Sequence, residues 1–157
     1  MRRLALLLAL SVFTALATAV ADGTAPRRSA EQEAVIRVVS DAYVDGIHNF
    51  RDPAAIRQGF HPDFEMLVLR EGKLEKLPLT AWIERLEAQN QKEPPPTRES
   101  GTRSTEARFP VVEVTGTAAF CKVELLRDGK QVFTDHIALY QFADGWKIVG
   151  KSFYRHP

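Results

Sequence analysis

The second half of the chain consists of strand-like runs that are separated by glycine-containing turns. Alternation of apolar and polar residues marks four such runs: residues 108–115, 117–127, 131–142 and 146–155. The junctions carry Gly116, Asp128-Gly129 and Asp144-Gly145, and glycine tolerates the left-handed backbone of tight hairpin turns. We therefore predict an antiparallel meander, which restricts the chain to folds built around a sheet.

The first half has the periodicity of helices. Apolar residues three and four positions apart over residues 31–46 predict an amphipathic helix, and Ser29 with Gln32 has the pattern of a capping box. A short helix is predicted over residues 53–59, because Asp52 is a suitable cap and the proline that follows it is tolerated in a first turn.

The middle of the chain connects these two halves. Residues 61–63 (His-Pro-Asp) are expected to form a turn, residues 64–79 a hairpin, and residues 80–91 a third helix with Thr80 as its cap. Residues 90–106 contain three consecutive prolines and few apolar residues, so we expect a long exposed loop that could also act as a lid. The order predicts an α+β architecture, with about three helices on one side of a curved antiparallel sheet.

The N-terminus has the pattern of a secretory signal peptide. A short basic lead precedes an apolar run, residues 4–16, and Ala19-Val20-Ala21 supplies the small residues that a signal peptidase accepts. The apolar run is shorter than the roughly 18 residues of a membrane-spanning helix. We therefore predict that residues 1–21 are removed and that 22–30 form a flexible lead to one domain, residues 31–157. The mature protein is expected to be periplasmic or secreted, with no stable membrane insertion.

Composition narrows the class of partner. Without Arg2 and Arg3, the mature chain keeps 19 basic and 20 acidic residues, and these are interspersed. We therefore expect no nucleic-acid surface. No two histidines or carboxylates stand at metal-ligand spacing, and we expect neither a metal nor a cofactor. The single cysteine, Cys121, lies in an apolar strand and is expected to be an inert buried thiol.

The turn at Asp128-Gly129 predicts the register of the strands beside it. A two-residue loop would place Lys122 opposite Asp135 on one face and His136 on the other face. The loop before the last strand can have two or three residues, and with three Lys151 would join the Lys122 face.

These charged groups allow two interpretations. A cross-strand ion pair at a half-exposed sheet would be ordinary sheet chemistry. The same groups would form a ligand site if they faced an apolar pocket. Both faces of the strands are substantially apolar, so we expect each face of the sheet to be covered.

The order of elements is also that of a known family. The whole mature chain resembles the nuclear-transport-factor-2-like cone fold, and within it the "putative lumazine-binding" branch of small exported bacterial proteins. The matching stretches are DAYVDGIHNFRDPAAIRQGFHPDF (41–64), AAFCKVELL (118–126) and FTDHIALYQFADGWKIVGKSF (133–153). The resemblance implies a pocket between the concave face of the sheet and the helices, and a homodimer that covers the outer sheet face.

The resemblance also directs attention to particular residues. Tyr43 takes the place on the first helix where cone-fold isomerases have a pocket tyrosine, and His61 stands where its ring can reach the mouth of the cone. The isomerase mechanism further needs a carboxylate base and a protonated acid, but those positions fall near Leu67 or Val68 and near Ala138. Because two of three groups are absent, isomerase activity is not carried over to this chain.

We therefore predict an exported, non-catalytic protein that binds a small anionic or aromatic molecule. The candidate ligand-binding residues are Tyr43, His61, Lys122, Asp135 and Lys151. Two alternatives stay open: an isomerase- or dehydratase-type enzyme with a rearranged acid/base pair such as His61 and Asp135, and a homodimeric protein-interaction module. Trp82 and Trp146 are expected to be packing residues, and His48 is expected to be exposed.

Overall fold

The computed structural model describes residues 27–157 except 100 and 102. The predicted signal peptide, residues 1–21, and most of the predicted lead, 22–30, lie outside the described residues. At the end of that lead, Arg28 donates a hydrogen bond to the carbonyl of Phe109 at 2.7 Å, and Ala30 already belongs to the first helix. Within the described part of the chain, every helix is too short or too polar to cross a bilayer.

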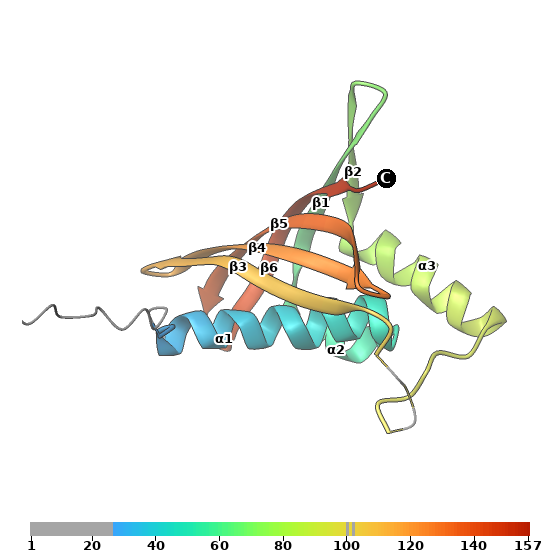
Figure 1. Cartoon of the computed structure of the whole chain (residues 1–157), viewed down its shortest axis with the longest axis horizontal. Helices are drawn as coiled ribbons and strands as arrows, with labels where there is room; N and C mark the ends of the chain where they lie inside the picture. The colour runs from blue at the N-terminus through green and yellow to red at the C-terminus, as the bar shows by residue number, and fades with distance from the viewer. Residues whose placement is uncertain (1–26, 100, 102) are drawn as a thin grey trace, which may run out of the picture.

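Helices form one layer and a curved six-stranded sheet forms the other (Figure 1). The described elements are α1 (Ala30–Val38), η1 (Val39–Asn49), α2 (Pro53–Gly59), β1 (Phe60–Arg70), β2 (Lys73–Pro78), α3 (Leu79–Lys92), β3 (Glu106–Thr115), β4 (Ala118–Arg127), β5 (Lys130–Phe142) and β6 (Gly145–Arg155). The strand order is β2-β1-β6-β5-β4-β3, with β1 parallel to β6 and the remaining neighbours antiparallel. The predicted α+β cone architecture is confirmed.

Local sequence signals explain most helix boundaries. Ser29 and Gln32 form the predicted capping box, and Asp52 caps α2 by accepting hydrogen bonds from the two amides that follow Pro53. The predicted cap of the third helix is wrong: α3 begins at Leu79, Pro78 is its N-cap, and no side chain caps it. Since Pro78 also ends β2, the hairpin passes directly into α3.

The predicted turn at residues 61–63 is also wrong. These residues belong to β1, whose register against β6 shifts between Phe60 and Glu65. The shift accommodates a proline that cannot donate a ladder hydrogen bond, because irregular places in a strand tolerate it. His61 therefore lies on a strand, and its ring stacks on that of Phe142 from the C-terminal end of β5.

The long first helix changes its winding halfway. Its second part, η1, is a π-helix, and the amide of Phe50 donates to the carbonyl of Asp45, five residues back. The helix α2 then packs closely against it: a Cβ added at Gly59 would lie 2.2 Å from the Cβ of Ala42. Glycine at this position therefore permits the close packing of α2 on η1 just before β1 begins.

The predicted register of the central strands is wrong by one residue. Arg127 does pair with Lys130, but Leu125 pairs with Phe133 and Leu126 with Gln131, so Val132 is an extra residue on β5. A β-bulge of this kind reverses the side-chain parity of everything beyond it. Lys122 consequently pairs with His136, not with Asp135, and the two lie on the outer face.

A second bulge resets the last strand. The loop between β5 and β6 has two residues, but Ala138 pairs with Gly150 and Leu139 with Ile148, which leaves Val149 unpaired. Lys151 therefore lies beside Ile137, the position that a three-residue loop would have given it. The prediction that this would be the Lys122 face is wrong, because the first bulge places Ile137 on the concave face.

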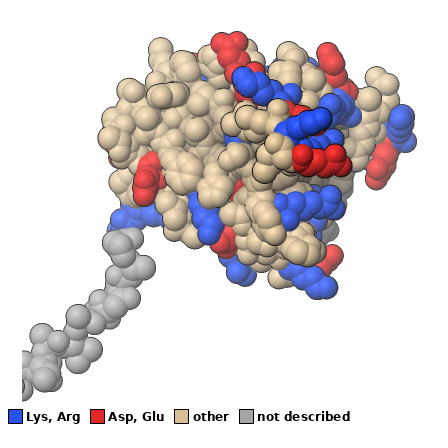
Figure 2. All heavy atoms as spheres, turned by 90° about the horizontal axis from the view of Figure 1, so that it is seen from above, with Lys and Arg blue, Asp and Glu red and all other residues tan. Residues whose placement is uncertain are grey.

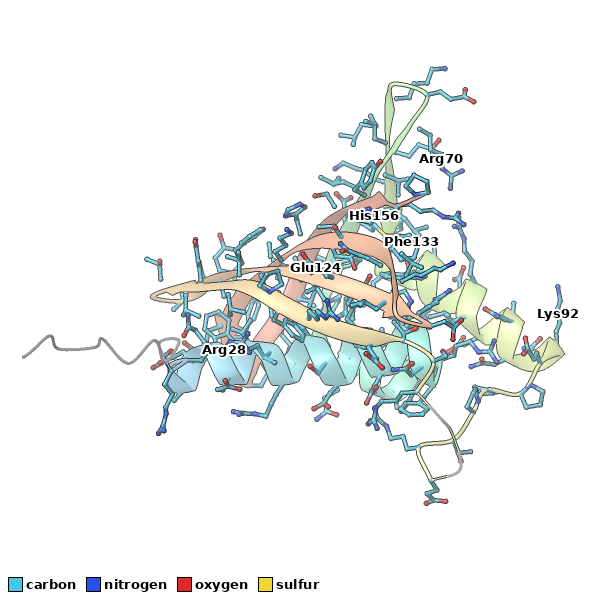
Figure 3. All side chains as sticks on the ribbon, in the orientation of Figure 1. Arg28, Arg70, Lys92, Glu124, Phe133 and His156 are labelled. Carbon is cyan, nitrogen blue, oxygen red and sulfur yellow. The ribbon has the colours of Figure 1, made fainter. Side chains whose placement is uncertain are left out.

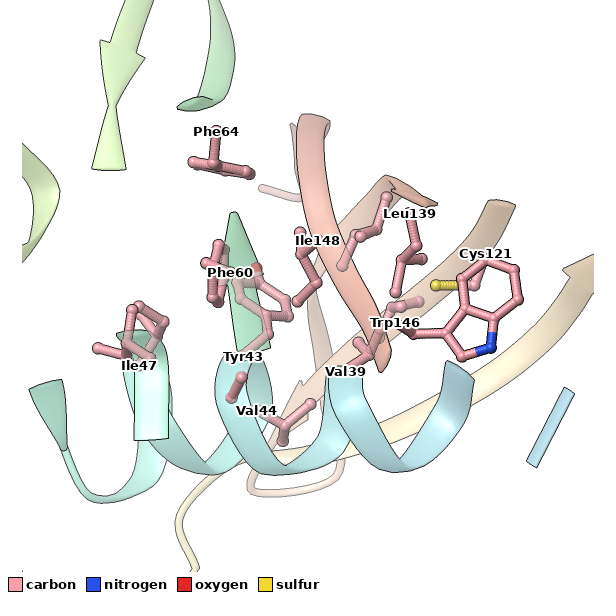
Figure 4. Close-up of a cluster of buried hydrophobic side chains, with 14 of the residues drawn as sticks. Val39, Tyr43, Val44, Ile47, Phe60, Phe64, Cys121, Leu139, Trp146 and Ile148 are labelled. Atoms are coloured by element: carbon pink, nitrogen blue, oxygen red, sulfur yellow. The ribbon is translucent and has the colours of Figure 1, made fainter. Parts of the chain in front are cut away.

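The core lies between this concave face and the helices (Figure 4). Its fully buried members include Val35, Val39, Tyr43, Phe60, Phe64, Cys121, Val123, Leu125, Ile137, Leu139 and Ile148. The outer face of the sheet keeps large side chains exposed, among them Phe120, Tyr140 and Tyr154. On the surface seen from above, Lys and Arg are interspersed with Asp and Glu over one part, while another part carries few charges (Figure 2).

Candidate functional site

An aromatic cavity of about 250 Å³ lies inside the cone, between α3, the end of η1 and strands β1, β5 and β6. Its lining residues are Tyr43, His48, Met66, Trp82, Phe133, Lys151, Phe153 and Arg155. Phe133 lies on the α3 side of the sheet (Figure 3). Trp82, Phe133 and Phe153 are each only partly buried, which is consistent with side chains that wall an open space.

Three polar groups from three elements meet beside this cavity. The hydroxyl of Tyr43 on η1 donates to one carboxylate oxygen of Asp135 on β5 at 2.7 Å. The ammonium of Lys151 on β6 lies 2.8 Å from the other carboxylate oxygen. All three residues are buried, with Asp135 completely inaccessible and Lys151 7% exposed. Because a buried charge is stable only when it is paired, each member depends on the others.

Aromatic rings surround the ammonium of Lys151. Its nitrogen lies 4.4 Å from the ring centroid of Phe153, 5.0 Å from that of Tyr43 and 5.9 Å from that of Trp82. Each distance is within the range of a cation–π contact. Burial lowers the pKa of Lys151, although the neighbouring Asp135 opposes that shift. Burial, and after it the charge of Asp135, raises the pKa of the Tyr43 hydroxyl well above its ordinary value.

His48 forms the end of the cavity nearest the C-terminus of η1. Its ring packs edge to face on Tyr43, with centroids 4.9 Å apart. A guanidinium nitrogen of Arg127 lies 3.4 Å from its Nδ1, and its Nε2 atom is buried with no hydrogen-bond partner among the described residues. Burial, and then the charges of Lys151 and Arg127, lower the pKa of His48 to about 3, so its ring is neutral at physiological pH.

The structure brings together three of the five predicted site residues. Tyr43, Asp135 and Lys151 line or border the cavity, whereas Lys122 lies on the outer face, where its ammonium is 3.3 Å from Glu124. His61 is half-buried on β1, and its interactions are with Asp63 and Phe142. It therefore belongs to neither the cavity nor the Asp135 cluster, and pairing of His61 with Asp135 as an acid and a base is excluded by this arrangement.

Sequence reasoning missed most of the cavity wall. The expectation that His48 is exposed is wrong, and Trp82 is a wall of the cavity as well as a packing residue. Met66, Phe133 and Phe153 gave no distinct signal, because an aromatic or Met on a half-buried strand is usual in any sheet. The spacing of Phe153 two residues after Lys151 was the available clue, since residues i and i+2 share a strand face.

Other hollows of the described surface are larger, and one of about 390 Å³ shares Met66, Trp82 and Phe153 with the aromatic cavity. The largest, about 570 Å³, is a groove between α1, α2 and the β5–β6 turn. Two ion pairs occupy its lining, Lys147 with Asp144 at 3.0 Å and Arg98 with Asp52 at 4.0 Å. No cluster of three or more metal-ligating side chains occurs among the residues that the structure describes. The aromatic cavity is therefore the candidate site.

The loop that follows α3 is fastened to the helices and not to the cavity wall. Arg98 and Arg103 both pair with the buried Asp45 of η1, and both guanidinium groups lie over the ring of Phe50. Asn49 donates to the carbonyl of Thr105 and accepts from its amide. The described part of this loop contributes nothing to the cavity lining, so it does not form a lid there.

Comparison with known proteins places this geometry in a fold family. Solved structures that are similar to this chain include an NTF-2 like protein of unknown function from Silicibacter pomeroyi, with 22% identity, a TM-score of 0.61, and coverage of 79% of this chain and 94% of that one. A protein from Shewanella baltica, described in the same way, has 22% identity, a TM-score of 0.61 and coverage of 83% and 99%. At this identity the likeness shows the fold alone.

A third such protein, from Methylobacillus flagellatus, has 20% identity, a TM-score of 0.57 and coverage of 80% and 91%. A comparison with curated proteins found no match. The family described as "Putative lumazine-binding" matches residues 30–154, which is nearly the whole described chain. The chain therefore belongs to this family, with the nuclear-transport-factor-2-like fold.

Proposed function

We propose that this protein binds a small planar aromatic molecule in the cavity beside Lys151. The observation that carries the proposal is an unfilled space of about 250 Å³ between the rings of Trp82, Phe133 and Phe153. Cavities for drug-sized ligands measure roughly 300–1,000 Å³, so this one suits a ligand of one or two rings. The family description and the cone fold support a small-molecule ligand of this kind.

The charges of the site favour an aromatic ligand over a multiply charged anion. An anion held jointly by Lys122 and Lys151 is no longer a reasonable expectation, because Lys122 lies on the opposite face of the sheet. The charge of Lys151 is balanced by Asp135, and only Arg155 at the cavity edge offers a cation whose side chain is exposed. Aromatic rings gain from offset-stacked and edge-to-face contacts, which the three walls can provide.

The hydrogen-bond directions support binding without catalysis. The hydroxyl hydrogen of Tyr43 is already donated to Asp135, and a carboxylate that is paired with Lys151 can only accept. An oxyanion hole made of a tyrosine and a protonated acid needs two free donors. Ala138, at the position predicted for that acid, and Leu67, near the position predicted for the base, both lie on the outer face.

The proposal includes export and self-association. The sequence pattern of residues 1–21 supports cleavage after Ala21, and mass measurement of the exported product should show a chain that starts at Asp22. The exposed Phe120, Tyr140 and Tyr154 support a homodimer through the outer sheet face. Light scattering at micromolar concentrations should give twice the mature mass, and a monomer there would refute the dimer.

Calorimetric titration tests the cavity directly, with lumazine as the probe because it is a two-ring planar heterocycle. Phe153→Ala should weaken binding by about tenfold, since loss of one stacked ring costs roughly 1 kcal/mol or more. Phe109→Ala is the matched control, because that ring is also partly buried against the core but does not line the cavity. Equal effects of the two replacements, or no heat of binding with lumazine or simpler one-ring aromatics, would contradict the proposal.

A further inference from the structure

Lys151 differs from the other lysines of the chain. Its side chain is 5% exposed and lines the aromatic cavity, whereas Lys73, Lys76, Lys92 and Lys130 are exposed and Lys122 and Lys147 are partly exposed. A protonated amine of this kind carries three hydrogens to donate. Among the residues that the structure describes, Nζ of Lys151 contacts the carboxylate of Asp135 at 2.8 Å and the weak acceptor Sδ of Met66 at 3.9 Å.

The surroundings make Lys151 easier to deprotonate than an exposed lysine. The walls that it faces are aromatic rings, which replace water around the charge. Burial lowers the pKa of Lys151. A proton acceptor lies 2.8 Å away in Asp135, and transfer of the proton along that contact would replace a buried ion pair by a neutral amine and a neutral acid. Desolvated lysines in apolar pockets are the usual nucleophiles toward carbonyl carbons.

We propose that Lys151 captures its ligand covalently, as an imine with a small planar aldehyde or ketone bound in the aromatic cavity. The inference rests on the proposed function, since the carbonyl compound must first enter the cavity. It adds the chemical class of the ligand: an aromatic ring that bears a carbonyl group at the edge facing Lys151.

The reaction is balanced within the residues present. The ammonium of Lys151 gives one proton to Asp135, and the freed electron pair forms a bond from Nζ to the carbonyl carbon. The carbonyl oxygen takes up the second nitrogen proton, which gives a neutral carbinolamine. Asp135 then returns its proton to the hydroxyl group, the C–O bond breaks, and water leaves.

The product is a protonated imine beside an ionised Asp135. Its charge is the same as that of the original ammonium, so the ion pair with Asp135 and the contacts with the rings of Tyr43 and Phe153 are kept. The net change is one carbonyl compound bound and one water released. Hydrolysis reverses it, which makes the capture a form of tight reversible binding and not a turnover.

Reductive trapping tests the inference on the intact mature protein. The probe is benzaldehyde with cyanoborohydride near neutral pH, followed by peptide mass mapping of all seven lysines. Lys151 should be benzylated at least about tenfold faster than any other lysine, because burial lowers its pKa and so increases the share of free amine, and because the cavity holds the aldehyde beside it. In denaturant the preference should disappear, since it depends on the fold.

A variant and a non-reactive analogue complete the design. The double change Lys151→Met with Asp135→Leu removes the amine without leaving a buried carboxylate, and it should abolish the fast phase of labelling. Benzyl alcohol has nearly the same shape and cannot form an imine, so its binding reports on the cavity alone. If the labelling of the lysines simply follows their solvent exposure, and Lys151 stays unlabelled while benzyl alcohol binds, the imine is overturned and the proposed function is left intact. If Lys151 stays unlabelled and benzyl alcohol does not bind, both the imine and the proposed function are overturned.

Discussion

Replacing Lys151 by methionine should cost far more stability than its number of hydrogen bonds suggests. The change leaves the carboxylate of Asp135 completely buried, and the Tyr43 hydroxyl still donates a hydrogen bond to it. Loss of one member of a buried pair typically costs about 3–5 kcal/mol, because the remaining charge must be desolvated alone or neutralised. We therefore expect the free energy of unfolding to fall by about 3 kcal/mol or more, and Asp135→Leu alone should have a comparable effect.

The double replacement should be less damaging than either single one. Methionine and leucine together remove both charges and fill a similar volume. The remaining loss of stability comes mainly from the Tyr43 hydroxyl, because it loses its hydrogen-bond acceptor. The coupling energy should then be several kcal/mol, and adding Tyr43→Phe should recover about 1 kcal/mol. Small single effects that simply add in the double variant would refute the reasoning.

Urea unfolding followed by tryptophan fluorescence measures these differences, and the chain offers a matched control. Arg57 of α2 and Glu87 of α3 form an ion pair at 2.8 Å, with side chains 56% and 43% exposed. Because exposed pairs are screened and contribute little, Arg57→Ala should cost under about 1 kcal/mol. A control that cost as much as Lys151→Met would show that exposure does not distinguish the two pairs.

Three further expectations follow from buried groups. His48 has a pKa of about 3 in the folded protein and about 6.5 when unfolded, so the stabilisation that it gives as a neutral ring is present above pH 6.5 and is lost at about 1.4 kcal/mol per pH unit as the pH falls towards 3. The difference in the free energy of unfolding between wild type and His48→Leu should show this slope, and a difference that does not change with pH would contradict it. Burial, and then Asp135, raise the pKa of Cys121 to about 12, so iodoacetamide at pH 8 should label it only after denaturation, and labelling of the native protein would show that the thiol is accessible. Burial opposes ionisation of Asp45, but hydrogen bonds from Arg103 and Asn49 outweigh it and lower its pKa. Asp45→Ala should therefore release the loop after α3 and speed proteolysis of that loop several-fold. Asp41→Ala, which removes an exposed carboxylate, is the control and should leave the rate of proteolysis unchanged.

The one-dimensional pattern determined the elements of this protein. Alternation, helical spacing and glycine-marked turns predicted every strand and helix to within a few residues, because these signals depend on neighbours along the chain. The caps at Ser29 and Asp52 were equally local and were predicted correctly. The prediction of a cap at Thr80 was wrong because β2 passes directly into α3. The path of the hairpin, and not a local cap, therefore sets where that helix begins.

The site was decided by tertiary structure. Asp135 and Lys151 were singled out from the sequence, but the partner assigned to Asp135 was wrong because Val132 is an extra residue in its strand. An apolar residue in an apolar run gives no sign that it is a bulge, since only the curvature of the whole sheet favours placing one there.

The environment of the cavity residues was also decided by tertiary structure. Tyr43 could be placed by its position on the first helix, whereas the half-buried His48 is neutral because tertiary packing sets the end of η1 beside Phe133 and Arg127. Local sequence determines which backbone conformations are accessible, but the protonation and the partner of a side chain depend on groups far away along the chain, as Lys151 is from His48. For this protein, sequence determined the cone, and packing of the curved sheet on the helices decided which charges face its interior.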